Sequence, residues 1–363
     1  MVDDRLEQAR SFAEEVRFSS DTLRGESDGS ARHASHLRSY FAQSALLIDD
    51  AVTPSLSTSL HRVYERLHIP AEAVQAFVYA SPEIQAECCA SNTRICVVRF
   101  SSAIVDLLDE DEIAFVAGHE LGHFLLGHGL PNRQRREQSL ESGMQLRGQE
   151  ISSDRIGLIA CRALDVAVRA LMKTASGLSS KHLRFDVGTF LSQLRHVDLE
   201  SGFQDAIASH PSMLVRCRAL LWFSLSDFFK KGERFYLLEQ MGRLDAMVKK
   251  DLAKYVDGPA RQRIADAKEN LALWMAVYEI VQDGVFANRE QEIFQRLFGD
   301  ATLQRLKDFL RDTDASRIGD EVFARVSIAR DELEGIIPIS FESEVERIQN
   351  KISKSFLGRL SKE

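Results

Sequence analysis

The sequence predicts a mainly α-helical chain with a small β-sheet, an α+β fold. Helical spacing of apolar residues recurs along most of the 363 residues and continues from Phe203 to the C-terminus. Two short runs rich in β-branched and aromatic residues, at 75–80 and 94–100, predict strands of one small sheet. The 20 glycines and 7 prolines are few, which disfavours a turn-rich all-β chain.

Length and charge limit the classes of protein that fit. At about 150 residues per domain, the chain should form two or three domains. We expect an N-terminal helical segment over 1–70, a central domain over 71–230 and a helical bundle over 231–363. The formal net charge of -8 provides no overall basic field, so we expect no nucleic-acid partner. Five scattered cysteines do not suit a disulfide scaffold.

The N-terminus and the apolar runs bear on localisation. Residues 1–18 lack the basic start and apolar stretch of a signal peptide. The longest apolar runs, such as 271–281, fall short of the roughly 18 residues that a membrane span needs. We therefore expect a soluble, cytoplasmic protein with no membrane span.

The first 70 residues are expected to form helices with one break. Residues 2–18 are charged and amphipathic, whereas 19–35 are rich in Ser, Gly and Asp and predict a loop. Helical spacing resumes over 39–68, where Pro54 either splits the stretch or starts its second helix.

A helix is most strongly indicated over 109–127. Asp109 and Glu112 have the spacing of a capping box, and Gly127 is a plausible stop signal. The interior at 113–118 is apolar on most sides, so this helix should run through a core. The polar residues 131–148 that follow could form a flap or a solvated helix, and 150–171 again shows helical spacing.

The buried helix contains the sequence His119-Glu120-Leu121-Gly122-His123, an H-E-x-x-H motif. Spacing of four places His119 and His123 one turn apart on one face, where both imidazoles can bind one cation. Zinc suits such nitrogen ligands. Glu120 lies close by and can accept a proton from a water that the metal acidifies.

A catalytic zinc site needs a third protein ligand, and Glu150 is the best candidate. Asp154, one turn later, can accept the second N–H of a ligating histidine and fix its tautomer. His128 is off the ligand face and is interpreted as a polar residue at the helix end rather than a ligand.

The motif also has an ordinary interpretation. H-E-x-x-H should occur by chance in on the order of 1% of chains this long, usually as two solvated histidines on a surface helix. The apolar flanks fit that poorly, because a buried helix with unpaired histidines and a glutamate would be destabilised. A zinc site is therefore the better interpretation, with one Zn²⁺ per chain.

Residues 107–123, with an acidic helix start before H-E-x-x-H, resemble the HtpX-like family of gluzincin zinc metallopeptidases. The family's following E-x-x-A-D helix is similar to 150–154, with Ser153 in place of Ala. The resemblance covers about 71–225. It implies a zincin-type metallopeptidase domain, in which a strand before the motif helix, here 94–100, flanks the cleft and pairs with substrate. The structural alternative for 94–100 is an ordinary core strand, and both can hold for one edge strand.

A third segment, 209–216, is similar to the family's late "H-P, then Arg" sequence. The resemblance implies that Arg216 stabilises the oxyanion and that His210 lies near the metal, where it could be a fourth ligand in a latent state. For His210, a helix-capping or loop role remains the structural alternative.

The C-terminal half carries weaker signals. Residues 276–292 resemble a TerB-like domain of the tellurite-resistance kind, which implies a stress-response or partner-docking module; a generic helical bundle fits nearly as well. Residues 342–363 carry an apolar stripe that could serve a dimer, a partner or its own domain.

The sequence thus predicts a soluble zinc metalloendopeptidase acting on a peptide or on an unfolded or specific protein substrate. His119, His123 and Glu150 hold the metal, Glu120 is the general base, and His210 and Arg216 assist catalysis. One alternative is a latent or regulatory protease-like protein whose helical C-terminal domain docks a partner or blocks the cleft. Another is a non-proteolytic zinc-binding module.

Overall fold

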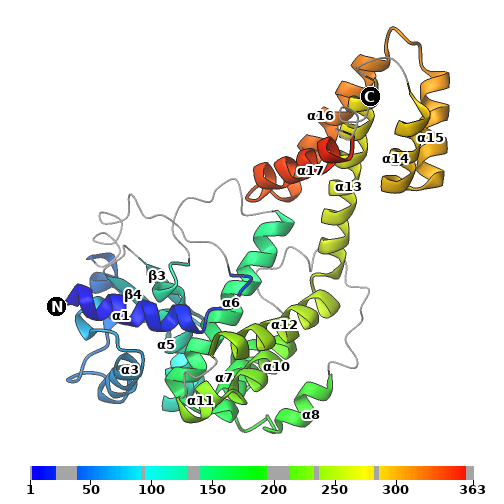
Figure 1. The fold of residues 1–363 in the computed structure, drawn as a ribbon. Helices are drawn as coiled ribbons and strands as arrows, with labels where there is room; N and C mark the ends of the chain where they lie inside the picture. The colour runs from blue at the N-terminus through cyan, green and yellow to red at the C-terminus, as the bar shows by residue number, and fades with distance from the viewer. Residues whose placement is uncertain are drawn as a thin grey trace. The chain divides into compact units, whose positions relative to one another are not determined.

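The computed structural model describes residues 2–21, 39–90, 95–128, 139–193, 213–232, 237–281 and 286–356 (Figure 1). Contacts divide the chain into two compact units. The first comprises 1–134 and 144–257, and the second comprises 135–143 and 258–363. This division does not test the domain boundaries expected at 70/71 and 230/231, which stay predictions.

The first unit contains a four-stranded mixed sheet with the strand order β1-β2-β4-β3. Its strands are β1 (Leu46–Leu47), β2 (Val74–Tyr79), β3 (Ala86–Ala90) and β4 (Cys96–Ser101). β2 and β4 correspond to the two predicted strands, and they pair in parallel with Val74 opposite Cys96. β3 pairs antiparallel with β4. A small sheet within a mainly helical chain confirms the predicted fold class.

Of the two interpretations of 94–100, its described part fits the ordinary core strand and not a strand free to pair with substrate. β4 pairs with β2 on one side and with β3 on the other, so its backbone groups are used within the sheet. Among the described strands, β3 is the one beyond β4, and it also contacts helix α5. The edge near the H-E-x-x-H helix is therefore formed by β3, which the sequence pattern did not indicate.

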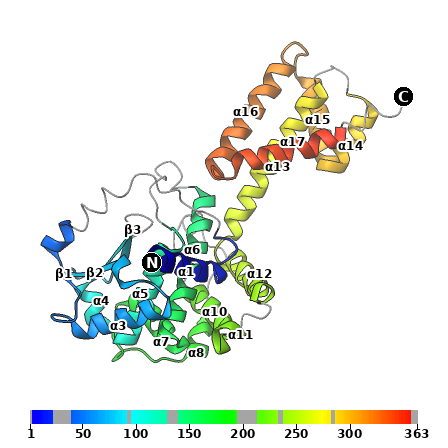
Figure 2. The same ribbon diagram turned by 60° about the vertical axis from the view of Figure 1, so that its left-hand side comes forward.

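The rest of the first unit is mainly helical, and some of its helices contact β3 and β4 (Figures 1 and 2). The helices that lie wholly or mostly in the first unit are α1 (Val2–Glu15), α3 (Pro54–Arg66), α4 (Ser102–Leu107), α5 (Glu110–Leu125), α6 (Leu140–Cys161), α7 (Leu164–Ser176), α8 (Val187–Ser192), α10 (Met213–Ser224), α11 (Asp227–Lys231) and α12 (Leu237–Tyr255), with a 3₁₀ turn, η1, at Ala71–Ala73. Pro54 begins α3, as one of the two sequence interpretations has it.

Helix α5 begins as predicted, with a capping box. The Asp109 side chain accepts hydrogen bonds from the backbone N–H groups of Asp111 and Glu112, and Glu112 accepts one from the N–H of Asp109. The helix runs through the largest apolar cluster, as its apolar interior predicted. The polar motif is therefore fixed inside a rigid core element.

Two glycines let α5 and α6 approach closely. A Cβ on Gly118 would collide with the side chain of Ala160, and one on Gly122 would lie 3.0 Å from the Cα of Ser153. Gly118 directly precedes His119, and Gly122 directly precedes His123. Glycine here is needed for the close approach rather than for backbone conformation, and that approach sets the distance from α5 to the acidic residues of α6.

Helix α6 differs from the sequence prediction at both ends. It begins at Leu140, so part of the segment expected to be a flap or a solvated helix is the start of α6, and Glu150 lies mid-helix. It ends at Cys161, where Arg162 adopts a φ of 63° and separates α6 from α7. Arg147 and Arg155 are buried in α6 and form ion pairs with Asp257 and Asp245. Such buried charges hide helix periodicity, because they make an inward face look polar.

The second unit is helical. Its elements are α13 (Gly258–Val281), α14 (Asn288–Phe298), α15 (Asp300–Asp312), α16 (Ile318–Ile336) and α17 (Phe341–Phe356). Helix α14 begins at Asn288, inside the segment 276–292 that resembles a TerB-like domain. α17 packs on α13 and α14 and buries four residues of the predicted stripe, Val345, Ile348, Ile352 and Phe356. The fifth, Leu360, lies outside the described residues. That stripe therefore packs on its own unit.

No helix among the described residues combines the length and the apolar character needed to cross a membrane.

Candidate metal centre

Helix α5 points the two motif histidines at one another. His119 Nε2 and His123 Nε2 lie 3.1 Å apart, with the two rings nearly perpendicular at an interplanar angle of 77°. His119 is buried and His123 is half-buried. The spacing of four in a helix produces this convergence, as the sequence predicted.

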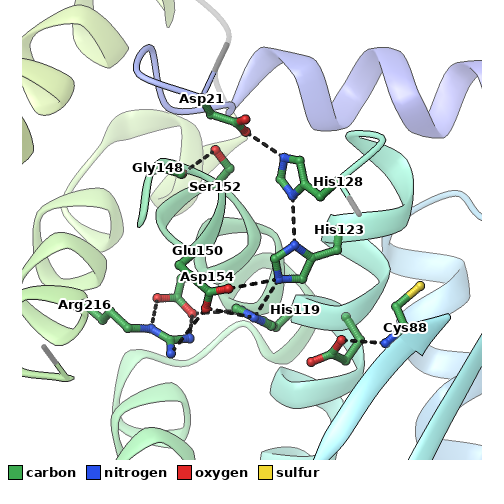
Figure 3. A network of polar contacts seen from close by, with 11 residues as sticks. Asp21, Cys88, His119, His123, His128, Gly148, Glu150, Ser152, Asp154 and Arg216 are labelled. Carbon is green, nitrogen blue, oxygen red and sulfur yellow. Dashed lines mark hydrogen bonds and ion pairs between the residues drawn. The ribbon is translucent and has the colours of Figure 1, made fainter. Parts of the chain in front are cut away.

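Helix α6 brings Glu150 to the same point (Figure 3). Its Oε2 lies 3.5 Å from His119 Nε2, and its Oε1 lies 3.4 Å from His123 Nε2. Ligands about 2.1 Å from a tetrahedral zinc ion are about 3.4 Å from one another. Two imidazole nitrogens and a carboxylate at these separations, as the one group of such ligands among the described residues, fit zinc.

The charges at this site favour a cation between the rings. Burial opposes ionisation of Glu150, but its interactions with the imidazoles of His119 and His123 and with the Arg216 guanidinium hold its pKa well below the ordinary value. Burial likewise opposes protonation of His123, yet the hydrogen bond and charge of Glu150 raise its pKa. A carboxylate that attracts a proton to a neighbouring imidazole also attracts a metal ion there.

Asp154 lies where the sequence placed it, one turn after Glu150. Its Oδ1 is 3.0 Å from His119 Nδ1, the nitrogen that faces away from His123. A carboxylate can only accept, so His119 carries its proton on Nδ1 and leaves Nε2 available for a metal.

Arg216, from α10, is joined to this acidic pair. It donates to both oxygens of Asp154, from Nε at 2.8 Å and from a terminal nitrogen at 2.6 Å, and another terminal nitrogen lies 3.4 Å from Glu150 Oε2. Burial would lower the pKa of Arg216, but these carboxylates raise it above its ordinary value. The predicted oxyanion role is not tested by these contacts, which show a guanidinium engaged with the carboxylates of α6. His210 lies outside the described residues.

Glu120 points toward the sheet rather than toward Glu150. Its Oε2 accepts a hydrogen bond of 2.8 Å from the backbone N–H of Cys88 in β3. Burial raises the pKa of Glu120, while the neighbouring His119 and His123 oppose the increase. The carboxylate is thus held between the motif helix and the edge strand, one residue from a metal ligand.

Two further residues were missed by the sequence analysis as parts of this site. His128 Nδ1 lies 2.9 Å from His123 Nδ1, and His128 Nε2 lies 2.9 Å from Asp21 Oδ2. Both side chains are buried. Burial lowers the pKa of His128 to about 4, although the hydrogen bond with Asp21 opposes this shift. His128 is not in the ligand cluster, as predicted, but it contacts a member of it.

Comparisons with known proteins show which sequences the region of this site is similar to. Residues 50–140 match the sequence profile described as peptidase family M48, so the match includes the H-E-x-x-H helix and ends before Glu150. The chain is 27% identical over 186 residues to the plastoglobule-localized metallopeptidase 48, chloroplastic, of Arabidopsis thaliana. That alignment covers 44% of this chain and 54% of the relative, so the chain spans about half the relative's length.

Over these segments the chain is similar to metallopeptidases of family M48. No solved structure matches the chain. The finer assignment to HtpX-like enzymes and the TerB-like resemblance of 276–292 stay predictions, as do the cytoplasmic location and the stress-response role.

Proposed function

We propose that this protein is a zinc-dependent metalloendopeptidase with one zinc ion held by His119, His123 and Glu150. The observation that carries the proposal is the convergence of these three side chains from α5 and α6 at 3.1–3.5 Å. A structural zinc site would not need a general base, but Glu120 lies beside the ligands. The family match of 50–140 supports the same class of enzyme.

When bound, zinc would acidify a water molecule and polarise the scissile carbonyl. Glu120 then accepts the proton that the attacking water loses and delivers it to the departing amine. The hydrogen bond from Cys88 holds the carboxylate in place for both transfers. The raised pKa of Glu120 suits a group that must both take up and release a proton.

The substrate backbone is proposed to lie along β3. This strand pairs with β4 on one side, and no described strand pairs with its other side. An extended peptide can add to such an edge through backbone hydrogen bonds. Since Cys88 in β3 contacts Glu120, a peptide bond along this edge would lie next to the general base and the metal ligands. The proposed substrates are peptides or extended segments of unfolded or specific proteins.

We propose that Arg216 acts mainly as a positioning residue. Its two hydrogen bonds to Asp154 orient the carboxylate that orients His119. Direct stabilisation of the oxyanion by Arg216 and His210 stays a prediction. So does partner docking by the helical C-terminal region, which underlies the latent-protein alternative.

The test compares wild type with Glu120→Gln at equal zinc content. Glutamine keeps the shape of the side chain but cannot accept the proton. We expect wild type to cleave an unfolded protein such as casein, and the variant to lose at least about 100-fold in rate. Equal rates would overturn the role of Glu120. Zinc bound by both proteins with cleavage by neither would favour the latent alternative, which a chain ending at Asp257 would then test.

A further inference from the structure

A line of hydrogen bonds leads away from the metal ligand His123 to the N-terminal part of the chain (Figure 3). His123 Nδ1 meets His128 Nδ1 at 2.9 Å, and His128 Nε2 meets Asp21 Oδ2 at 2.9 Å. Asp21 is 1% exposed and His128 3% exposed, so water does not compete for these contacts. The three side chains form one buried relay, here named the Asp21 relay.

The chemistry of the groups fixes where each proton lies. An ionised carboxylate can only accept, so His128 must donate from Nε2 to Asp21. In a neutral His128, Nδ1 then carries no proton and can only accept a hydrogen bond. His123 must therefore donate to it from its own Nδ1. The Nε2 of His123 is therefore unprotonated, and it is the nitrogen that faces His119 Nε2 and Glu150. The relay selects the tautomer that can bind a metal.

The other ligand histidine, His119, is oriented by a carboxylate without an intervening histidine. His119 Nδ1 contacts the carboxylate of Asp154 directly, at 3.0 Å. Each ligand histidine is therefore linked by hydrogen bonds to a buried carboxylate. His119 contacts Asp154 directly, and His123 is linked to Asp21 through His128. Groups that orient ligating imidazoles in this way contribute to metal affinity.

The segment that carries Asp21 is held firmly against the helices of the first unit. The N–H of Phe18 donates to Ser152 Oγ at 3.0 Å, and the N–H of Ser19 donates to Asp245 Oδ2 at 2.8 Å. The backbone of Ser20 and Asp21 packs so closely on Gly148 that a Cβ there would lie 3.2 Å from Ser20. The segment is thus anchored to α6, which carries Glu150, and to α12.

We infer that Asp21 and His128 are positioning residues of the metal centre, which set the tautomer and orientation of His123 from outside its ligand shell. This inference rests on the proposed function, because it requires His123 to bind a metal. It also makes the N-terminal segment, which precedes the matched region 50–140, part of the metal centre.

The test uses the full chain and measures zinc affinity by competition with a chromophoric chelator at a fixed neutral pH. His128→Leu removes the acceptor of His123. His128→Asn keeps an oxygen near the position of Nδ1 and so can still accept from His123. Asp21→Asn removes the charge with little change of shape, and Ser20→Ala is the matched control in the same segment.

We expect His128→Leu to weaken zinc binding about tenfold or more, and His128→Asn to recover most of the loss. Asp21→Asn should weaken binding several-fold in the wild-type background and add nothing to His128→Leu, because Asp21 acts through His128. Ser20→Ala should bind zinc like wild type. A merely structural role would lower stability in both His128 variants alike and would not show rescue by asparagine.

A second measurement takes its readout from the wild-type protein and uses a variant only for assignment. In the zinc-loaded wild-type protein labelled with ¹⁵N-histidine, we expect His123 protonated on Nδ1 and His128 on Nε2, with His128→Asn used to assign the signals. A His128 protonated on Nδ1, or zinc affinities of His128→Leu and Asp21→Asn within about twofold of wild type, would overturn the inference. Absence of zinc from wild type would instead refute the proposed function.

Discussion

Asp154 joins Arg216 to the metal ligand His119. One carboxylate oxygen lies 3.0 Å from His119 Nδ1 and also accepts a 2.6 Å hydrogen bond from Arg216, while its second oxygen accepts another at 2.8 Å. Burial opposes ionisation of Asp154, but the Arg216 guanidinium holds its pKa below the ordinary value. Arg216 therefore keeps Asp154 ionised and aimed at His119.

Replacing Arg216 separates the two roles considered for it. If Arg216 positions Asp154, Arg216→Met should lower zinc affinity about tenfold, because the carboxylate loses its orienting partner. Arg216→Lys should recover only part of the loss, since lysine cannot form two parallel hydrogen bonds. Chelator competition and casein cleavage are measured together. Unchanged zinc affinity with lost cleavage would instead support the oxyanion role.

The close contact between α5 and α6 should depend on Gly118. Gly118→Ala adds a Cβ that collides with Ala160, so we expect a loss of roughly 1–3 kcal/mol of stability and weaker zinc binding. The matched control is Gly242→Ala in α12, where nothing lies within 4 Å of an added Cβ. That change should stabilise the protein by up to about 1 kcal/mol. Urea unfolding with and without zinc measures both, and equal effects of the two substitutions would contradict the account.

The metal-free protein should lose stability in acid through His128. Its pKa is about 4 in the folded protein, against about 6.5 when unfolded. The unfolded chain therefore binds more protons between these values. The stabilising contribution of neutral His128 is complete above about pH 6.5 and decreases below it. The loss amounts to roughly 3 kcal/mol by pH 4.

Unfolding of the first unit can be followed through one tryptophan. The chain has two, of which Trp222 lies in α10, so Trp274→Phe leaves a reporter in the first unit. In that background we expect the free energy of unfolding to fall more steeply between pH 7 and pH 4 with His128 than with His128→Leu. Parallel curves for the two proteins would show that His128 does not titrate in this way.

The sequence alone was enough to predict the relative positions of site residues that lie on the same helix. His119 and His123 share a face because of their spacing of four, and the capping box at Asp109 located the start of their helix. Glu150 and Asp154 follow the same rule on α6. Local rules work here because one helix fixes each pair, and the structure places the four side chains together.

The remaining contacts join segments far apart in the chain. His128 and Asp21 are 107 residues apart, and no periodicity connects them. β3 was missed because Ala86–Ala90 has little of the β-branched character that marks strands, and antiparallel pairing with β4 determines its conformation. The start of α6 was obscured because Arg147 is buried in an ion pair with Asp257. Tertiary contacts decide all three features.

The central claim is a zinc ion held by two histidines and one glutamate. X-ray absorption at the zinc edge of the purified protein, together with metal analysis, tests it most directly. We predict about one zinc per chain, surrounded by two imidazole nitrogens and oxygen donors near 2.0–2.1 Å, with no sulfur ligand. Absence of zinc, or a sulfur ligand at about 2.3 Å from a cysteine such as Cys88, would contradict the account.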